Sequence, residues 1–376
     1  MKTAFFNGSL LVGHDWRQDT ALLVSDGVIE GTCQETDIPD GYELEDLKGG
    51  RLLPGFIDTQ VNGGGGMMLN DAKSVEDIAT IAAAHRKFGT TAMLPTLITD
   101  SWEKMERVAA LIREAIAEGM PGILGIHFEG PYLNPARKGV HDAAHIRDIE
   151  ERFVDLVTAG DLGQVLVTLA PEKVPHDIIR KLTAKGVHVS AGHSTASFEE
   201  MQAAMEAGLT GVTHLYNAMP PMESRAPGLI GAALNFSECY CGFINDGHHV
   251  HPATLKAAIA AKGVDHMMLV TDAMSTVGTE ETRLTLGGTE ITLKDGRLTT
   301  PNGTLAGSAL DMAAAVRHAV NLLDLRLEYA VQMATESPAA FLGLTSSHGR
   351  IAPGYRADLV LMDAKMRVQK SWITGQ

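Results

Sequence analysis

Short apolar segments alternate with longer amphipathic segments through most of this chain, and this alternation constrains the fold more than any other feature of the sequence. The apolar segments recur at a spacing of roughly 30 residues, which is typical of βα units. Eight such units predict a closed (β/α)₈ barrel of the TIM type. The candidate strands end at Gln60, Thr96, Glu129, Ala170, His193, His214, Asn245 and Asp272. The helical segments between them include 75–87, 102–118, 150–158, 175–185, 198–207 and 252–261.

A doubly wound open sheet is the alternative arrangement for parallel βα units. Its first strand normally leads into a glycine-rich turn that binds a dinucleotide. No G-x-G-x-x-G motif stands in that place, where the chain reads Gly63-Gly64-Gly65-Gly66 instead. No Lys-Ser/Thr pair follows this glycine run, so it indicates a turn rather than a phosphate cradle. The sequence therefore favours the barrel.

The two ends of the chain differ from its middle. Residues 1–50 carry short strand-like runs split by turn pairs such as Asn7-Gly8, and residues 358–373 carry similar runs. Both ends therefore resemble strands of one small β domain, and the barrel would be an insertion between them. We expect a small β domain over 1–52 and 349–376, and a barrel domain over 53–348.

Net charge and cysteine content disfavour several classes of function. The formal net charge is −15, whereas nucleic-acid binding usually requires a basic face. A single arginine or histidine can still hold a small anion against this overall charge. Cys33, Cys239 and Cys241 are too few for a disulfide framework, and no apolar run is long enough for a signal peptide or membrane helix. We expect a cytoplasmic protein that binds neither nucleic acid nor membranes.

Ionisable side chains stand at the ends of several candidate strands, where a βα barrel builds its active site. Glu129 closes GILGIHFE, His193 closes VHVSAGH, and His214 closes GVTH. One carboxylate and two imidazoles with an open position are typical of a catalytic zinc centre. Each histidine alone would be better explained as a hydrogen-bonded residue near a strand end. Their joint placement favours a metal site.

Asp272 ends the last candidate strand, in MMLVTDAMS. A carboxylate beside a metal ion can take a proton from the attacking water and return it to the leaving group. The alternative role is that of a turn residue or helix N-cap. Because Asp272 is in register with the candidate ligands, we favour the catalytic role.

Seven blocks of the sequence carry a resemblance to a known family. They are PGFIDTQVNG, GIHFEGPYLNPARKGVH, SAGHS, THLYNAMPPMESRAPGLIGAA, NDGHHVHP, LVTDAM and GTLAGSALDM. In these blocks the chain resembles the N-acetylglucosamine-6-phosphate deacetylases of the amidohydrolase superfamily, and the resemblance covers most of its length. The family fold is a (β/α)₈ barrel with a small β-sandwich built from both termini, which agrees with the organisation above.

The resemblance implies hydrolysis of N-acetyl-D-glucosamine 6-phosphate to D-glucosamine 6-phosphate and acetate, in amino-sugar catabolism and cell-wall recycling. It implies one divalent metal ion per subunit, most simply Zn²⁺ with Fe²⁺, Mn²⁺ or Co²⁺ as alternatives, held by Glu129, His193 and His214. It also makes Asp272 the general base and then the general acid. His141 would polarise the acetamide carbonyl.

The resemblance further implies a set of substrate contacts. In this family the phosphate-binding arginine reaches across from a neighbouring subunit, so Arg225 implies a homodimer. His249 would hold the 6-phosphate with Arg225, whereas the roles of His248 and His251 in the same DGHHVH block stay open. The expected sugar contacts are Val140, Asn217, Ala218, Leu305, Ala306 and Gly307.

Three other functions compete with this interpretation. Another amidohydrolase, acting on an N-acyl amino acid or a cyclic amide, would share the metal set. N-acetylgalactosamine 6-phosphate differs from the glucosamine substrate at one hydroxyl, and the sequence does not separate the two. A barrel that had lost catalysis would be expected to lose its ligands or its base, and all of them are present here.

Gln60 and Asn62 close PGFIDTQVN, the first candidate strand. Alternate residues of a strand point to one side, and superfamily members with two metals carry His-x-His in this place. An amide oxygen is a weaker ligand for zinc than an imidazole nitrogen. The two amides therefore predict a centre with one metal, in which Gln60 would hydrogen-bond the bound water.

Metal analysis of protein purified without added metal should give one tightly held ion per chain. Two tightly held ions per chain would contradict this interpretation of Gln60 and Asn62.

Overall fold

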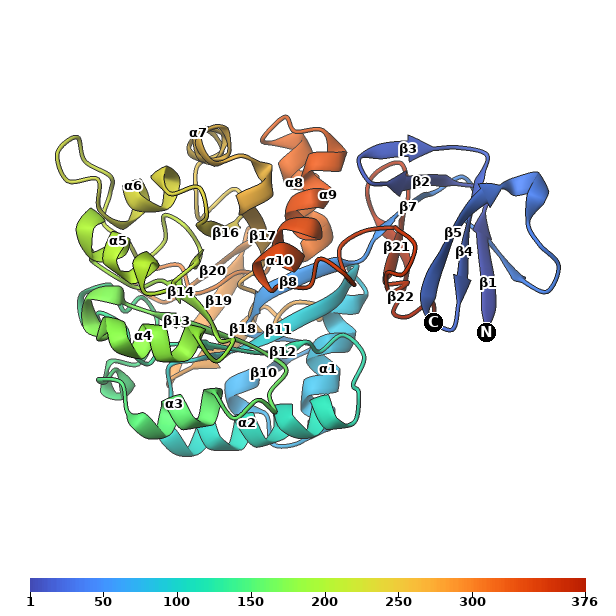
Figure 1. The fold of residues 1–376 in the computed structure, drawn as a ribbon. Coiled ribbons are helices and arrows are strands. Elements are labelled where there is room, and N and C mark those ends of the chain that lie inside the picture. Colours follow the sequence, from blue (N-terminus) through green and yellow to red (C-terminus); the bar gives the residue numbers. More distant parts are fainter.

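The computed structural model describes residues 1–376 and contains a parallel eight-stranded sheet that forms a barrel (Figure 1). The predicted TIM-type barrel is confirmed, and each predicted strand end lies within two residues of the observed end. The strands follow one another around the sheet in chain order. They are β8 (Phe56–Val61), β11 (Thr90–Ile98), β12 (Gly125–Glu129), β13 (Gln164–Leu169), β14 (His188–Ala191), β15 (Gly211–Val212), β16 (Tyr240–Ile244) and β17 (Met267–Val270).

Helices cover the outside of the barrel (Figure 1). In α2 the side chain of Ser101 caps the first turn, and Val108 and Ile112 lie on the buried face at helical spacing. The helices are α1 (Val75–Arg86), α2 (Trp102–Ala117), α3 (Glu151–Val157), α4 (His176–Thr183), α5 (Phe198–Glu206), α6 (Gly228–Asn235), α7 (Pro252–Lys262), α8 (Met312–Asn321), α9 (Leu327–Ala334) and α10 (Glu336–Phe341). Short 3₁₀ turns are η1 (Glu35–Asp37), η2 (Leu69–Asp71), η3 (Pro135–Arg137), η4 (Ala143–His145), η5 (Pro171–Lys173) and η6 (Val264–His266).

Strands from both ends of the chain form two further sheets beside the barrel, and both termini lie there (Figure 1). Phe5 and Trp372 pack edge to face between them, with ring centroids 5.1 Å apart. One sheet has the order β5 (Val28–Gln34), β4 (Thr20–Ser25), β1 (Lys2–Phe6) and β6 (Glu43–Asp46). The other has the order β22 (Val368–Trp372), β21 (Leu359–Met362), β7 (Arg51–Pro54), β2 (Ser9–Val12) and β3 (Asp15–Arg17).

These sheets are the small β part of the predicted fold, and they contain a separate apolar core that includes Phe5, Leu22 and Leu359. We propose that the domain division follows the one expected from the sequence, with 1–52 and 349–376 outside the barrel domain. Strand β7 continues to Pro54, so its last two residues pair within the small β part although they lie beyond the expected boundary at residue 52.

Two small sheets that were not expected from the sequence lie near the barrel mouth. Strands β18 (Arg283–Leu286), β19 (Thr289–Lys294) and β20 (Arg297–Thr299) form an antiparallel sheet after the last barrel strand. Strands β9 (Gly63–Gly64) and β10 (Met67–Met68) form a small hairpin. Its turn contains Gly65 and Gly66 at φ of +63° and +84°, a conformation that favours glycine.

The barrel closes between its first and last strands through buried polar contacts. The N–H of Asp272 donates to the carbonyl of Gln60 at 2.9 Å. The hydroxyl of Thr271 donates to Asp58 Oδ2 at 2.5 Å, and the carboxyl of Asp58 is fully buried. Burial raises the pKa of Asp58 to about 7, although the hydrogen bonds that its carboxyl accepts from Thr271 and Gln60 act to lower it. This seam places the end of β8 directly beside Asp272.

Thr271→Val should lower the midpoint of thermal unfolding, because it removes the hydroxyl donor to the buried Asp58 while keeping the side-chain volume. Removing one partner of a buried group costs about 1–3 kcal/mol. Thr36→Val is the matched control, since the Thr36 hydroxyl bonds Asp37 on the surface. Equal midpoints for Thr271→Val and wild type would show that the seam does not depend on this contact.

Candidate active site

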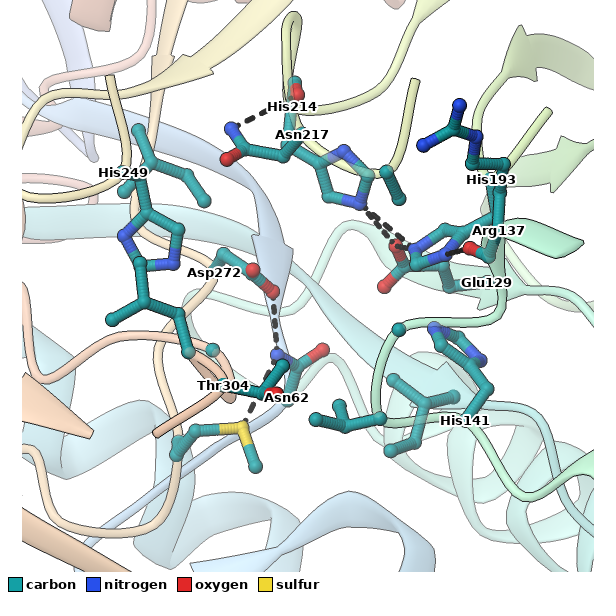
Figure 2. A pocket seen from close by; sticks show the side chains of 18 of the residues that line it. Asn62, Glu129, Arg137, His141, His193, His214, Asn217, His249, Asp272 and Thr304 are labelled. Carbon is teal, nitrogen blue, oxygen red and sulfur yellow. Dashed lines mark hydrogen bonds and ion pairs between the residues drawn. The ribbon is translucent and has the colours of Figure 1, made fainter. Parts of the chain in front are cut away.

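A cavity of about 540 Å³ opens at the carboxyl ends of the barrel strands (Figure 2). Ionisable side chains face it from the ends of five strands or from the loops just after them. Its wall contains Asn62, Ile98, Glu129, Ala136, Arg137, Gly139, Val140, His141, His193, His214, Asn217, Ala218, Ile244, His249, Asp272, Met274, Gly303, Thr304, Leu305 and Gly307.

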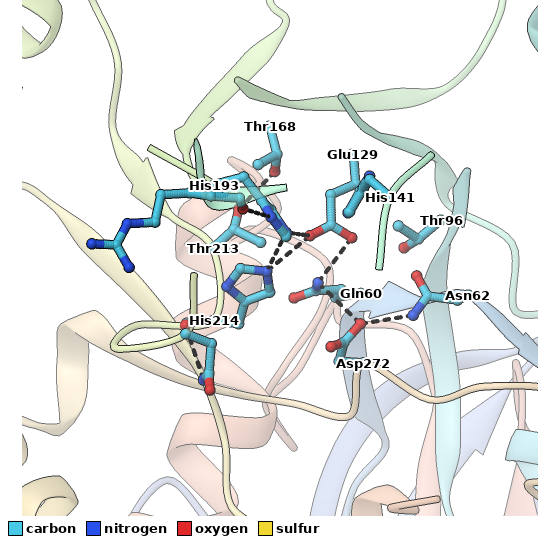
Figure 3. A network of polar contacts seen from close by, with 12 residues as sticks. Gln60, Asn62, Thr96, Glu129, His141, Thr168, His193, Thr213, His214 and Asp272 are labelled. Atoms are coloured by element: carbon cyan, nitrogen blue, oxygen red, sulfur yellow. Dashed lines mark hydrogen bonds and ion pairs between the residues drawn. The ribbon is translucent and has the colours of Figure 1, made fainter. Parts of the chain in front are cut away.

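Glu129, His193 and His214 converge at the base of this cavity (Figure 3). The Nε2 atoms of His193 and His214 lie 3.1 and 2.9 Å from Glu129 Oε1. The two Nε2 atoms are 3.0 Å apart. All three residues are buried, so three electron-rich atoms share one small volume that is largely shielded from bulk water.

This donor set fits a divalent metal ion. His193 Nδ1 donates to the Arg137 carbonyl at 2.8 Å, so the neutral ring presents the lone pair of Nε2 to the cluster. Two imidazole nitrogens and one carboxylate oxygen are the ligand types of a catalytic zinc centre. By contrast, His214 Nδ1 is buried without a hydrogen-bond partner in the protein. Only His193 is therefore oriented by an outer hydrogen bond.

Three ionisable residues of the site have a positive φ although none is glycine. The values are +49° for His193, +35° for His214 and +51° for Asp272. Left-handed backbone at such residues costs on the order of 1–3 kcal/mol and persists only where the surroundings enforce it. The side chains are thus directed into the cavity by backbone that the rest of the barrel must hold in place.

Two amides lie between the carboxylates of Asp272 and Glu129. Gln60 Nε2 donates to Glu129 Oε2 and to Asp272 Oδ1, each at 3.2 Å. Asn62 Nδ2 donates to Asp272 Oδ1 at 2.7 Å (Figure 3). These neutral donors stabilise two like charges that would otherwise repel each other in a buried place.

The two carboxylates have pKa values displaced in opposite directions. Burial, followed by the charge of Glu129, raises the pKa of Asp272 to about 6. For Glu129 burial also works against the charge, but the imidazoles of His193 and His214 beside it outweigh burial and hold the pKa well below its usual range. Asp272 can therefore exchange a proton near neutral pH, whereas Glu129 stays ionised.

His141 faces the cavity beside His193, with ring centroids 4.3 Å apart (Figure 2). Burial lowers the pKa of His141 to about 3, so the ring is neutral. The Thr99 hydroxyl lies 2.8 Å from Nδ1, and the Thr99 N–H donates to Nδ1 at 3.4 Å. Because Nδ1 accepts, the ring proton is on Nε2, which can donate to a substrate oxygen.

Comparison with known proteins identifies the family to which this chain belongs. The family model described as the Amidohydrolase family matches residues 51–376. The chain belongs to the amidohydrolase family. The resemblance inferred from the sequence is confirmed, and the chain is an enzyme of this family.

Individual relatives narrow the comparison further. The amidohydrolase is 48% identical over 361 residues to the N-acetylgalactosamine-6-phosphate deacetylase of Shewanella sp. (strain ANA-3), covering 95% of this chain and 91% of that protein. The N-acetylglucosamine-6-phosphate deacetylase of Pasteurella multocida superposes with a TM-score of 0.96 at 34% identity, over 100% of this chain and 99% of that one. A mutant of the Mycobacterium smegmatis deacetylase, solved in complex with N-acetyl-D-glucosamine-6-phosphate, gives a TM-score of 0.91 at 30% identity, over 100% and 98% of the two chains.

The predicted substrate contacts of the amidohydrolase are distributed unevenly in the structure. Ala306 is fully buried behind the wall, and Arg225 is exposed on a loop outside the cavity of its own chain. Gln60 also lies behind the wall, where it bonds the two carboxylates. The other predicted residues line the cavity: Val140, His141, Asn217, Ala218, His249, Leu305, Gly307 and Asn62.

Only one of the three histidines in DGHHVH lines the cavity of the amidohydrolase. His249 Nδ1 donates to Asp246 Oδ2 at 2.6 Å, which leaves Nε2 for the cavity. His248 Nδ1 instead accepts from Arg297 Nε at 3.1 Å. His251 caps α7 by accepting from the N–H of Ala253 at 3.2 Å.

The sequence analysis missed two polar wall residues, Arg137 and Thr304. Arg137 stands inside the block GPYLNPARKGVH, so the block pointed to its loop but not to its side chain. Thr304 follows the unpredicted sheet β18–β20, which brings its loop over the cavity.

No helix in the structure combines the length and apolar character needed to cross a bilayer.

His193→Asn should lose metal during dialysis against a chelator under conditions in which the wild type retains it. The loss of affinity should exceed the ~10–100-fold that follows loss of an outer hydrogen bond to a ligand. His248→Asn is the matched control, because His248 lies outside the cavity wall. Unchanged metal retention in His193→Asn would contradict the proposed ligand set.

Proposed function

We propose that this amidohydrolase hydrolyses N-acetyl-D-glucosamine 6-phosphate to D-glucosamine 6-phosphate and acetate. The observation that carries the proposal is the buried set of Glu129, His193 and His214 beside Asp272, whose pKa is raised to about 6. The names of the relatives support this choice of reaction over the hydrolysis of an N-acyl amino acid or a cyclic amide.

Glu129, His193 and His214 would hold one divalent ion per chain, most simply Zn²⁺, with Fe²⁺, Mn²⁺ or Co²⁺ as alternatives. Such an ion, when bound, supplies Lewis-acid activation of water and of the substrate carbonyl. Gln60 and Asn62 use their amide N–H groups on the two carboxylates. They therefore stabilise the two carboxylates of this site and do not form a second metal position.

Asp272 takes the proton of the attacking water and later delivers it to the nitrogen of the amide. The water oxygen bonds to the acetyl carbon, the C–N bond breaks, and the amine leaves with the proton. His141 donates from Nε2 to the carbonyl oxygen as negative charge develops on it. The neutral state of His141 suits this donation, because a neutral ring keeps one N–H directed at the substrate.

The phosphate of the substrate requires cationic donors at the outer part of the cavity. Arg225 is exposed and outside the wall of its own chain, which suits a residue that completes the cavity of a second copy. We therefore propose a homodimer in which Arg225 and His249 contact the 6-phosphate, while Val140, Asn217, Ala218 and the 305–307 segment surround the sugar. Arginine forms bidentate contacts with phosphate.

N-acetylgalactosamine 6-phosphate is a second candidate substrate. The relative with 48% identity over 95% of this chain is named for this sugar. The two sugars differ in the orientation of one hydroxyl, far from the bond that is cleaved. The same residues would therefore perform the same chemistry on both.

We further infer that the enzyme acts in the cytoplasm, in amino-sugar catabolism and cell-wall recycling. All three cysteines are free in the structure, which supports a reducing compartment.

Acetate release should be measured with N-acetylglucosamine 6-phosphate, N-acetylgalactosamine 6-phosphate and unphosphorylated N-acetylglucosamine. The better sugar phosphate should exceed the free sugar in kcat/KM by at least about 10-fold, because one charge-assisted hydrogen bond contributes ~1.5–3 kcal/mol. Equal turnover of phosphorylated and free sugar would refute the phosphate site. No release from any of the three would refute the proposed reaction.

Asp272→Asn should lower turnover by about 10²–10⁴-fold, the range expected for a lost general base. Metal analysis of the same preparation is the control, and the metal content should equal that of the wild type. In the wild type kcat/KM should fall as the pH drops through the pKa of Asp272, because a protonated carboxyl accepts no proton. A near-normal rate for the variant would overturn this role.

A further inference from the structure

Glu172 lies in η5, just after barrel strand β13, and its side chain is not part of the cavity wall. Its carboxylate nevertheless accepts hydrogen bonds from both residues that follow His193. Ser194 Oγ donates to Oε2 at 2.6 Å, and the N–H of Thr195 donates to Oε1 at 2.7 Å. The hydroxyl of Thr195 also donates to Oε1 at 3.2 Å. The loop that carries His193 is thus tied to the neighbouring strand through one carboxylate.

The same carboxylate holds the loop on the other side of His193. Asn134 is buried, and its Nδ2 donates to Glu172 Oε1 at 2.9 Å and to Thr195 Oγ1 at 2.7 Å. The N–H of Asn134 donates to the carbonyl of His193 at 2.9 Å. Asn134 begins the segment that leads through Arg137 to His141.

Together with the backbone between them, these hydrogen bonds form a closed ring of contacts that surrounds the side chain of His193. Glu172 binds Ser194 and Asn134, and the segment after Asn134 returns through the Arg137 carbonyl to His193 Nδ1 at 2.8 Å. His193 needs such support, because its φ of +49° is not a conformation that a regular strand would maintain. Carboxylate acceptors form the stronger class of hydrogen bond, which makes Glu172 the anchor of this ring.

We propose that Glu172 is a positioning residue that orients His193 for metal binding and joins its loop to the one that carries His141. The inference rests on the proposed function only in taking His193 as a metal ligand. Glu172 touches neither the cavity nor the other two ligands, so its effect must pass through His193 and the two loops.

Metal affinity, measured by chelator competition on the purified full-length chain with Zn²⁺ as the probe, tests the proposal without any substrate. Glu172→Ala should weaken Zn²⁺ binding by about 10-fold, the lower end of the ~10–100-fold that follows loss of a direct outer partner, because Glu172 acts on His193 only through its neighbours. Glu172→Gln should weaken it less, because the amide keeps one acceptor for Thr195 and replaces the other by a donor facing Ser194. Saturating Zn²⁺ should restore part of the lost turnover.

Glu200→Gln is the matched control. Glu200 accepts the N–H of Ser197 at 2.8 Å in the capping box of α5, close in sequence to His193 but without contact to Ser194 or Thr195. It should lower the thermal midpoint slightly and leave Zn²⁺ affinity unchanged. Equal loss of Zn²⁺ affinity in Glu200→Gln and Glu172→Gln would show a general structural effect and overturn the proposal.

Wild-type Zn²⁺ affinity in both Glu172 variants would also overturn it. If Glu172→Ala does not fold, Ser194→Ala removes a single donor to the same carboxylate and should still weaken Zn²⁺ binding several-fold; an unchanged affinity would again refute the inference. A wild-type chain that binds Zn²⁺ but releases no acetate would refute the proposed reaction and leave the role of Glu172 standing.

Discussion

The active site depends on placing two carboxylates close together in a buried cavity without neutralising both of them. Glu129 is held ionised by the two imidazoles, whereas Asp272 receives only amide donors and the unfavourable charge of Glu129. Their pKa values therefore separate, and this separation fits the proposed roles of Glu129 as a metal ligand and Asp272 as a proton carrier. Gln60 and Asn62 reduce the cost of burying the two carboxylates together, since each amide donates to a carboxylate and neither adds a charge.

The surrounding barrel has to stabilise backbone conformations in the site that are unfavourable by themselves. Positive φ values at His193, His214 and Asp272 are unfavourable in isolation, and the cluster is stable only if neighbouring elements hold it. The seam between β8 and β17 supports Asp272, and the ring of contacts through Glu172 supports His193. Below the cluster, His127 bonds Thr168 in a buried polar layer, and burial lowers the pKa of His127 to about 4. This layer supplies hydrogen bonds under the site without adding charge.

The sequence predicted most of the fold and the centre of the site, and its failures have physical causes. Barrel strands are apolar and regularly spaced, so their ends could be located to within two residues. Strands β18–β20 do carry alternating apolar residues, with Gly287-Gly288 and Asp295-Gly296 as turn pairs between them. They were missed because the strand–helix alternation that marks the barrel does not describe antiparallel hairpins. Arg137 was missed because its place in the cavity follows from the path of a loop, and side-chain direction in a loop has no sequence period. The family itself was confirmed by comparison.

The sequence by itself determined which side chains would gather, because the carboxyl ends of parallel strands meet at one face of a barrel. Glu129, His193, His214 and Asp272 could thus be grouped although up to 143 residues separate them. Only the tertiary structure decided how they interact, because hydrogen bonds and pKa values depend on distances and burial that strand order leaves open. It placed Gln60 between two carboxylates, and it put Arg225 outside the cavity of its own chain. It also revealed Glu172 behind His193, since that contact joins two loops with no common pattern in the sequence.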